Sequence, residues 1–258
     1  MTGLPDRSIR DAYVELIKRA VTNYPYLGGE APFEAFRCAT HYDLERGEWK
    51  IDPLARPLTL LTKAQLDLVE KAAVALEERK VPGDFLEAGV WRGGVVVLMR
   101  ALLDAYGIAG RRVFAADSFA GIPRNVRALN DPVDQWPDRW VASLDEVRRN
   151  IARFGLLDER IVFTVGFFEE SLKALAGERF ALIRLDSDSY DSVATSLERL
   201  YPLLSRWGIV IVDDWHLPGC RMAVLDYRAK YRIGDEIQVY EGNAYWVKQQ
   251  RYGLPERI

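Results

Sequence analysis

Four aspartates follow two apolar runs of the chain, and their spacing could support chemistry. They are Asp186 and Asp188 after residues 181–185, and Asp213 and Asp214 after residues 209–212. A stretch with helical periodicity separates the runs, which is the pattern of a strand–helix–strand unit. Parallel strands joined in this way normally lie side by side. The sequence therefore predicts that the four carboxylates meet at the carboxyl edge of one sheet, where open α/β sheets bind ligands.

Clustered carboxylates repel one another unless a positive charge lies among them, and a hard divalent cation such as Mg²⁺ is suited to oxygen ligands. The pattern thus favours a metal site. The alternative is that Asp186 and Asp188 cap the next helix and that Asp213 and Asp214 begin a turn. His216 follows the second pair, and it either orients a substrate, acts as a base or is simply solvated.

A glycine-rich turn comes earlier in the chain. Residues 84–88 are predicted to form a strand, residues 89–94 the turn, and residues 95–106 a helix. Such a turn lets the backbone approach a ligand and directs helix N–H groups towards it. The spacing is not GxGxxG, and Glu87 would repel a pyrophosphate. An acid at this position suits a ligand that carries a cationic amine.

The next predicted strand, residues 112–116, ends at Asp117 and Ser118. An acid at this strand tip can accept hydrogen bonds from ribose hydroxyls, although a turn or a helix cap is the simpler explanation. Together with the glycine-rich turn, it favours a ligand that contains a nucleoside. A third strand, residues 161–165, precedes Gly166 and Phe168, and the aromatic ring could face an adenine or fill the core.

The remaining segments frame this set of strands. Residues 221–231 are predicted to be helical, and residues 237–240 and 244–248 to form a hairpin. Residues 121–140 make a long loop, which is typical of a functional segment, and Ser143 with Glu146 forms a capping-box pattern that opens the helix ending at residue 154. Residues 1–80 contain helices over residues 9–22 and 63–79, the second capped by Thr62, around an aromatic irregular stretch at 23–57. We expect residues 1–80 to form a lid or oligomerisation region and residues 81–258 the main domain.

Composition limits the function classes. The 258 residues carry a net charge of −3, about half are apolar, and no dense lysine and arginine cluster argues for nucleic acid. Two cysteines far apart in the sequence argue against a disulfide framework or a zinc site. No apolar run reaches the length of a signal core or a membrane span. These features predict a cytoplasmic protein with no membrane or nucleic-acid partner.

Five βα units that end in a hairpin describe a Rossmann-like class I methyltransferase sheet of the α/β class, mostly parallel with an antiparallel C-terminal hairpin strand. Four motifs carry a closer resemblance: VPGDFLEAGVWRGG, VFAADSFAGIP, IRLDSDSYDS and IVDDWHLPGCRMAVLDYR. In this order they resemble the macrocin O-methyltransferase family, over about residues 58–231. Ser187 and Trp215 depart from the residues that members of the family often carry, and Trp215 could reshape the acceptor pocket.

The resemblance implies S-adenosylmethionine as methyl donor, Mg²⁺ as cofactor, and a sugar hydroxyl of a glycosylated natural product, such as a macrolide-type antibiotic, as acceptor. It implies donor contacts at Thr59 and Leu60 in a lid, at Glu87, Ala88 and Gly89 for the methionine part, at Asp117 for the ribose, and at Ser118, Ser143, Gly166 and Phe168 for the adenosine. It implies Asp186, Asp213 and Asp214 as metal ligands. Asp186 is the first candidate for the general base, followed by Asp188 and His216.

Three other functions fit parts of the pattern. A metal-dependent methyltransferase of catechol-like phenols would use the same sheet and cation. A metal-dependent hydrolase would use acidic strand tips but not the Glu87 to Gly94 turn. A non-catalytic donor-binding protein would not need the clustered carboxylates. The aromatic N-terminal stretch also predicts a homo-oligomer, a dimer or higher.

Overall fold

A seven-stranded sheet forms the centre of the computed structural model, which describes residues 7–43, 46, 48–127 and 140–249. The strand order is β5-β4-β3-β6-β7-β9-β8. The strands are β3 (Asp84–Ala88), β4 (Val113–Asp117), β5 (Ile161–Val165), β6 (Phe180–Leu185), β7 (Leu204–Val212), β8 (Gln238–Tyr240) and β9 (Asn243–Val247). The first five are parallel, and β9 runs antiparallel to both β7 and β8. This arrangement confirms the predicted sheet.

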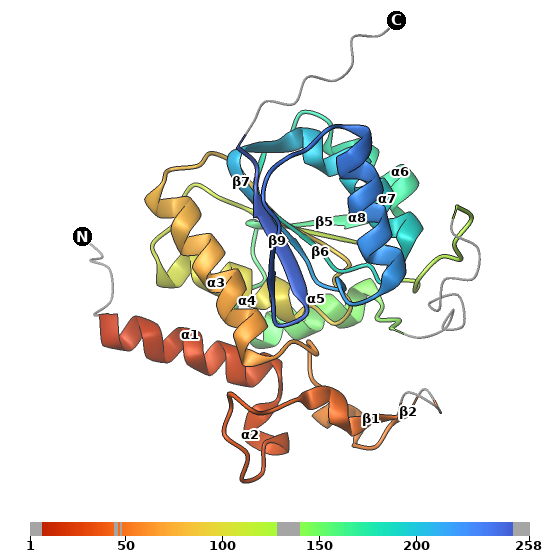
Figure 1. The fold of residues 1–258 in the computed structure, drawn as a ribbon. Coiled ribbons are helices and arrows are strands. Elements are labelled where there is room, and N and C mark those ends of the chain that lie inside the picture. The colour runs from red at the N-terminus through yellow and green to blue at the C-terminus, as the bar shows by residue number, and fades with distance from the viewer. Residues whose placement is uncertain (1–6, 44–45, 47, 128–139, 250–258) are drawn as a thin grey trace, which may run out of the picture.

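Helices cover both faces of the sheet (Figure 1). The longer helices are α1 (Arg7–Val21), α3 (Lys63–Glu78), α4 (Gly94–Ala105), α5 (Leu144–Arg153), α7 (Tyr190–Leu200) and α8 (Pro218–Lys230). The first four contribute to one buried cluster, and the last two contribute to a second cluster on the opposite face. Both faces of the central strands are therefore buried, which explains why β6 is apolar except for Arg184.

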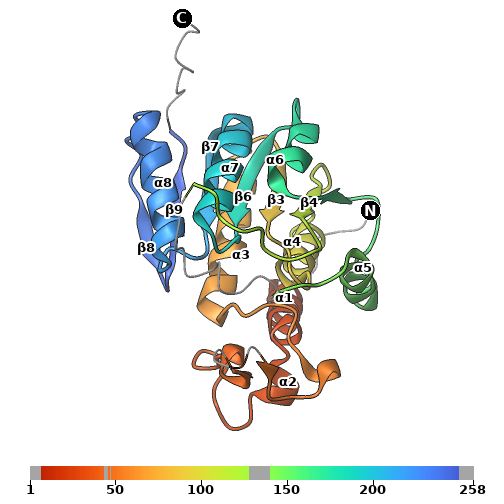
Figure 2. The ribbon, with the colours of Figure 1, turned by 90° about the vertical axis from the view of Figure 1, so that its right-hand side faces the viewer.

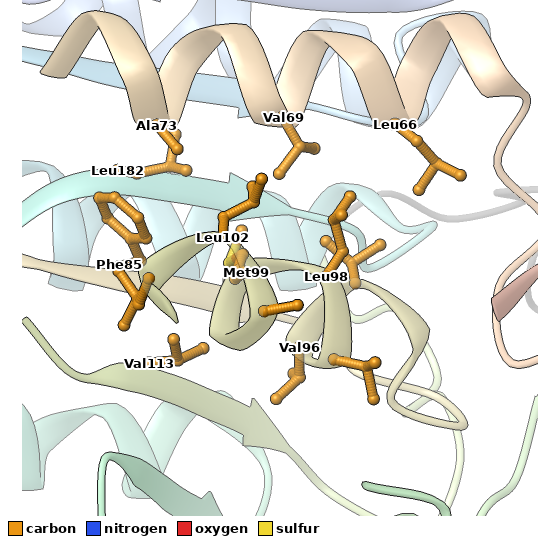
Figure 3. Packing of buried hydrophobic residues seen from close by; sticks show 14 of the residues in the cluster. Leu66, Val69, Ala73, Phe85, Val96, Leu98, Met99, Leu102, Val113 and Leu182 are labelled. Carbon is orange, nitrogen blue, oxygen red and sulfur yellow. The ribbon is translucent and has the colours of Figure 1, made fainter. Parts of the chain in front are cut away.

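The first cluster shows how the helices are held. In Figure 3, Leu66, Val69 and Ala73 of α3 point towards Leu182 of β6 and the apolar side of α4. Thr62 caps α3, because its side chain accepts the Gln65 N–H while the Gln65 side chain accepts the Thr62 N–H. Helix α3 is thus fixed in position at its first turn and along its apolar face.

The N-terminal region contains short elements that the sequence did not predict. They are α2 (Tyr24–Leu27), the 3₁₀ turns Cys38–His41 and Pro53–Ala55, and the two-stranded β1 (Tyr42–Asp43) and β2 (Glu48–Trp49). Figure 2 shows α1 and α2 grouped at one end of the molecule. Val14, Ile17 and Val21 of α1 belong to the same buried cluster as the sheet residues, so α1 packs as part of the main core. The division at residue 80 stays a prediction.

Some predicted bounds differ from the observed ones. Strand β7 begins at Leu204, five residues before the predicted run, because Leu204 pairs with Phe180 of β6. After β5 the chain forms α6 (Phe168–Ser171) and the 3₁₀ turn Leu172–Leu175, and Tyr201–Leu203 forms another before β7. Residues 128–139 of the predicted functional loop lie outside the described residues. No helix in the described ranges has the length and apolar content needed to cross a membrane.

Candidate active site

The acidic tips of β6 and β7 meet, as the sequence predicted. Leu185 and Val212 are partners in the parallel ladder, and the Asp213 N–H donates to the Leu185 carbonyl at 2.9 Å. Carboxylate oxygens of Asp186, Asp188 and Asp214 all lie within 4.8 Å of one another. These three side chains, named here the acidic triad, present only oxygen atoms, the ligands that Mg²⁺ prefers.

Asp213 turns towards a different partner. Its Oδ1 lies 2.8 Å from Nη2 of Arg184, whose side chain is fully buried (0 % exposed) in β6. Nη1 of the same guanidinium donates to Asp186 at 2.8 Å and also to Glu87 of β3. Asp213 and Asp186 are therefore held by Arg184, while Asp186 also belongs to the acidic triad.

Burial and mutual repulsion perturb these acids. Burial raises the pKa of Asp214 well above its ordinary value, and the nearby charges of Asp188 and Asp186 raise it further. Burial raises the pKa of Asp213 to about 6 and that of Glu87 to about 8, although Arg184 opposes both shifts. Because burial and mutual repulsion disfavour the ionised form of these acids, a cation bound among them would be stabilising.

The glycine-rich turn approaches the acidic tips very closely. At Gly89 the backbone has φ of +91°, and a Cβ there would lie 1.5 Å from the Asp186 carbonyl oxygen. Asp117 holds the turn, because its Oδ2 accepts the N–H groups of Val90 at 2.6 Å and Trp91 at 3.1 Å. The positive φ of Trp91, +44°, is fixed in this way. The expected nucleoside site and the acidic triad are thus adjoining.

The predicted lid segment is anchored over the start of α4. The Gly94 N–H donates to the Leu58 carbonyl at 3.0 Å, and Arg92 donates to the Pro57 carbonyl at 2.9 Å. A Cβ on Gly94 would lie 2.7 Å from the Leu58 backbone, so only glycine permits this contact. Thr59 and Leu60 are thereby placed against the turn.

A cleft of about 430 Å³ joins these features. Its walls include most of the predicted site residues: Thr59, Leu60, Glu87, Gly89, Asp117, Ser118, Phe168, Asp186, Asp188, Asp213, Asp214 and His216. Three other predicted residues, all described in the structure, do not line it: Ala88, Ser143 and Gly166. Ser143 instead caps α5 by accepting the Glu146 N–H at 3.2 Å. The Glu146 side chain, which the capping-box pattern would turn back to residue 143, accepts from Arg92 at 2.8 Å.

Aromatic side chains from three separate segments border the cleft. Tyr42, Trp91 and Trp140 line it, and Trp49 stacks on Trp91 with ring centroids 6.1 Å apart. Trp140 contacts both Tyr42 at 4.9 Å and Trp91 at 5.6 Å. The sequence analysis did not assign these residues to the site. It noted the aromatic stretch, but local pattern could not show that the rings converge.

The loop after β4 forms the outer wall of the cleft with Ile122 and Pro123. Its later part is tied to the start of α7, because Asp191 accepts the N–H groups of Val126 and Arg127, the latter at 3.0 Å. The Asp191 N–H in turn donates to Asn125 at 3.0 Å. This loop is therefore fastened to α7, the helix that directly follows Asp186 and Asp188.

The protein resembles characterised enzymes over most of its length. The profile of a family described as Macrocin-O-methyltransferase (TylF) matches residues 34–249. A tetracenomycin-C 4'-O-methyltransferase of Streptomyces olivaceus, specific by name for a dimethoxyrhamnosyl derivative, is 39% identical over 251 residues, 92% of each chain. Mycinamicin III 3''-O-methyltransferase of Micromonospora griseorubida is 33% identical, covering 92% of this chain and 96% of its own.

Solved structures of methyltransferases also resemble this chain over most of its length. The O-methyltransferase NovP is 32% identical, superimposes with a TM-score of 0.79, and matches 93% of this chain and 100% of its own. The calicheamicin methyltransferase CalS11 is 20% identical with a TM-score of 0.61, covering 94% of this chain and 93% of its own, and this likeness supports the fold alone.

Proposed function

Because the chain belongs to the macrocin O-methyltransferase family and is an S-adenosylmethionine-dependent O-methyltransferase, we propose that it methylates a sugar hydroxyl of a glycosylated natural product and that it requires Mg²⁺. The names of the relatives support the acceptor class, since one refers to a rhamnosyl-bearing tetracenomycin and another to mycinamicin III. The acidic triad beside the cleft is the observation that carries the metal requirement.

The donor set fits a hard divalent cation. Asp186 and Asp214 belong both to the acidic triad and to the ligand set that the family resemblance implies, so we assign them first. The third protein ligand is either Asp188, which lies in the triad, or Asp213, which would have to leave Arg184. The raised pKa of Asp214 supports a cation at this position, because burial and neighbouring acids disfavour its charge.

When bound, Mg²⁺ would lower the pKa of the acceptor hydroxyl and orient its oxygen. Asp186 would receive the hydroxyl proton, since its side chain is 30% exposed at the cleft and its Oδ2 is already fixed by Arg184. The oxygen forms a bond to the methyl carbon as the carbon–sulfur bond breaks, and the sulfur keeps the electron pair. The sulfonium loses its charge in this step, so we expect positioning to supply most of the acceleration.

Glu87 and Asp117 are the proposed anchors of the donor. Glu87 lines the cleft, and its Oε2 finds no hydrogen-bond partner among the described residues, so it can accept the donor ammonium group. Asp117 accepts three backbone N–H groups, which fix its carboxylate in the wall of the cleft, where it would accept the ribose hydroxyls. Ser118 and Phe168 would contact the adenosine, and Thr59 and Leu60 would close over the donor. Ala88, Ser143 and Gly166 do not line the cleft, so we assign them no donor contact.

The test combines calorimetry with a methyl-transfer assay against a panel of glycosylated natural products and, separately, a catechol without a sugar. We expect S-adenosylmethionine to bind the wild type, and turnover on a glycosylated acceptor to need Mg²⁺. Asp186→Asn and Asp214→Asn should each lose at least about a hundredfold in turnover. Asp226→Asn is the matched control, because this exposed acid of α8 contacts Tyr190 away from the cleft.

The outcomes separate the parts of the proposal. Absence of donor binding would contradict the whole assignment, and full turnover in a chelator would contradict the metal. Turnover on the catechol alone would replace the sugar acceptor by a phenol. Asp188→Asn and Asp213→Asn, compared in the same assay, identify the third ligand by the larger rise in the Mg²⁺ concentration needed.

We also propose that the enzyme works in the cytoplasm. Cys38 and Cys220 are both buried, and neither forms a disulfide, which suits a reducing compartment. Fractionation of producing cells that placed the protein outside the cytoplasm would contradict this.

A further inference from the structure

Arg184 is a charged residue at the centre of the sheet. It lies in β6 between β3 and β7, paired in register with Glu87 on one side and Ile211 on the other. Its guanidinium contacts Glu87, Asp186 and Asp213, which come from three adjacent strand ends. A fully buried arginine has to be compensated by opposite charge, and here three carboxylates lie in ion-pair contact with its guanidinium, although its Nε and Nη2 find no hydrogen-bond partner among the described residues.

The shape of the side chain matters as much as its charge. One nitrogen, Nη1, contacts both Glu87 and Asp186, and the other, Nη2, faces Asp213 at 2.8 Å. A planar guanidinium can hold acids in several fixed directions, whereas a lysine ammonium is a single point charge on a flexible stem. Arg184 therefore fixes the relative orientation of acids that belong to two different parts of the cleft.

These two parts bind different cations under the function proposed above, on which this inference rests. Glu87 would bind the ammonium group of the donor. Asp186 and Asp214, with Asp188 or Asp213, would bind the metal. We propose that Arg184 is a positioning residue that links the donor site to the metal site, so that its guanidinium sets the affinity of both although it contacts neither ligand. The reaction needs both ligands in fixed relative positions, and a shared cation beneath them provides that alignment.

The test measures the two affinities separately, without turnover. Binding of S-adenosylhomocysteine, which carries the same amino-acid part as the donor, is followed by calorimetry without metal. Binding of Mn²⁺ as the metal probe is followed by electron paramagnetic resonance without donor. In Arg184→Lys, which keeps the charge but loses the planar fork, we expect each Kd to rise about tenfold.

Arg100→Lys is the matched control. Arg100 is also buried and also paired with two acids, Asp104 and Asp158, but it lies on α4 outside the cleft. Both variants should lower the melting temperature, while only Arg184→Lys should change the two Kd values. Unchanged Kd values in folded Arg184→Lys overturn the link, and so does a change in one Kd alone. Failure of the wild type to bind S-adenosylhomocysteine would instead contradict the proposed function.

A second comparison remains decisive if Arg184→Lys does not fold. Asp213→Asn removes an acid that contacts Arg184, and Asp226→Asn removes an exposed acid of α8 that contacts Tyr190 away from the cleft. Loss of Asp213 should leave the guanidinium more fully paired with Glu87 and weaken S-adenosylhomocysteine binding at least about threefold. Asp226→Asn should leave that affinity unchanged. Equal effects of the two variants would contradict the link through Arg184.

Discussion

Gly89 allows the donor turn and the acidic triad to adjoin. Its backbone lies against the Asp186 carbonyl with no room for a side chain, and its φ of +91° is one that other residues rarely adopt. The contact lies between the end of β3 and the end of β6, so any displacement would separate the two halves of the cleft.

We therefore expect Gly89→Ala to lower the free energy of unfolding by about 2 kcal/mol or more and to reduce turnover sharply. The physical reason is the clash between the new Cβ and Asp186. Urea denaturation and the methyl-transfer assay measure the two effects. Gly110→Ala is the control, since nothing lies within 4 Å of the position that its Cβ would take. Equal stability of both variants would show that the turn can move away.

Arg184 also marks what the sequence could not reveal at this scale. An arginine inside the apolar run of β6 was a signal, because a charge is rarely placed between buried residues without a partner. The partner, Glu87, lies 97 residues earlier in the chain. Their contact depends on the alignment of β3 with β6, which local pattern does not specify.

At the scale of elements, the pairing of α1 with α3 depends on buried charges. Lys18 of α1 is only 4% exposed in its side chain and contacts Asp67 at 2.5 Å, while Lys63 contacts the same acid at 2.8 Å. Burial alone would raise the pKa of Asp67, but hydrogen bonds from Lys18 and Lys63 lower it overall. This acid therefore ties the N-terminal helix to the helix that precedes β3.

Asp67→Asn should lower the free energy of unfolding by about 1 kcal/mol near pH 7. The pKa of Asp67 is lower in the folded state than in the unfolded state, where it is near 3.9. This stabilisation is therefore present above about pH 4 and is lost as the pH falls through the folded pKa. The difference between variant and wild type in urea denaturation should shrink accordingly. Asp11→Asn, at an acid of α1 that is 53% exposed, is the control and should change stability by less than about 0.5 kcal/mol. A difference that is constant with pH would contradict the ion pair.

The sequence predicted best the short strands with a clear apolar run and the helix starts with a capping residue. The bounds of β3 and β5 match the prediction, and the Thr62 cap forms as expected, whereas only the Ser143 half of the predicted capping box forms. The N-terminal strands β1 and β2 were missed because each has two residues, too few for a period to show. The convergence of Tyr42, Trp91 and Trp140 was missed because, like the contact of Arg184 with Glu87, it depends on packing between residues that are far apart in the sequence.

At the scale of the whole molecule, the metal should matter for activity more than for folding. The core is formed by apolar packing on both faces of the sheet, and the acidic triad lies at its edge. We expect a chelator to abolish turnover while changing the melting temperature by less than about 3 °C. Calorimetric melting with and without chelator measures this, and a large loss of stability would assign the cation a structural role.

We further expect a dimer or a higher oligomer. Exposed apolar side chains support this, among them Tyr26 and Leu54 in the N-terminal region and Val239 on β8, the edge strand of the sheet. Size-exclusion chromatography with light scattering should give at least twice the chain mass of 29.4 kDa. A single monomeric species at micromolar concentration would contradict the expectation.

The order of the strands has a consequence for how such an enzyme can diversify. Glu87 and Arg184 lie in β3 and β6, and the reactive aspartates directly follow β6 and β7, in the middle of the sheet, where neighbouring strands constrain them. The outer wall of the cleft comes from the N-terminal segment and from the loop after β4, which is fastened to α7 through Asp191. Selectivity for the acceptor can therefore evolve separately from reactivity, because the segments that form the wall can change between relatives while the central strands stay the same.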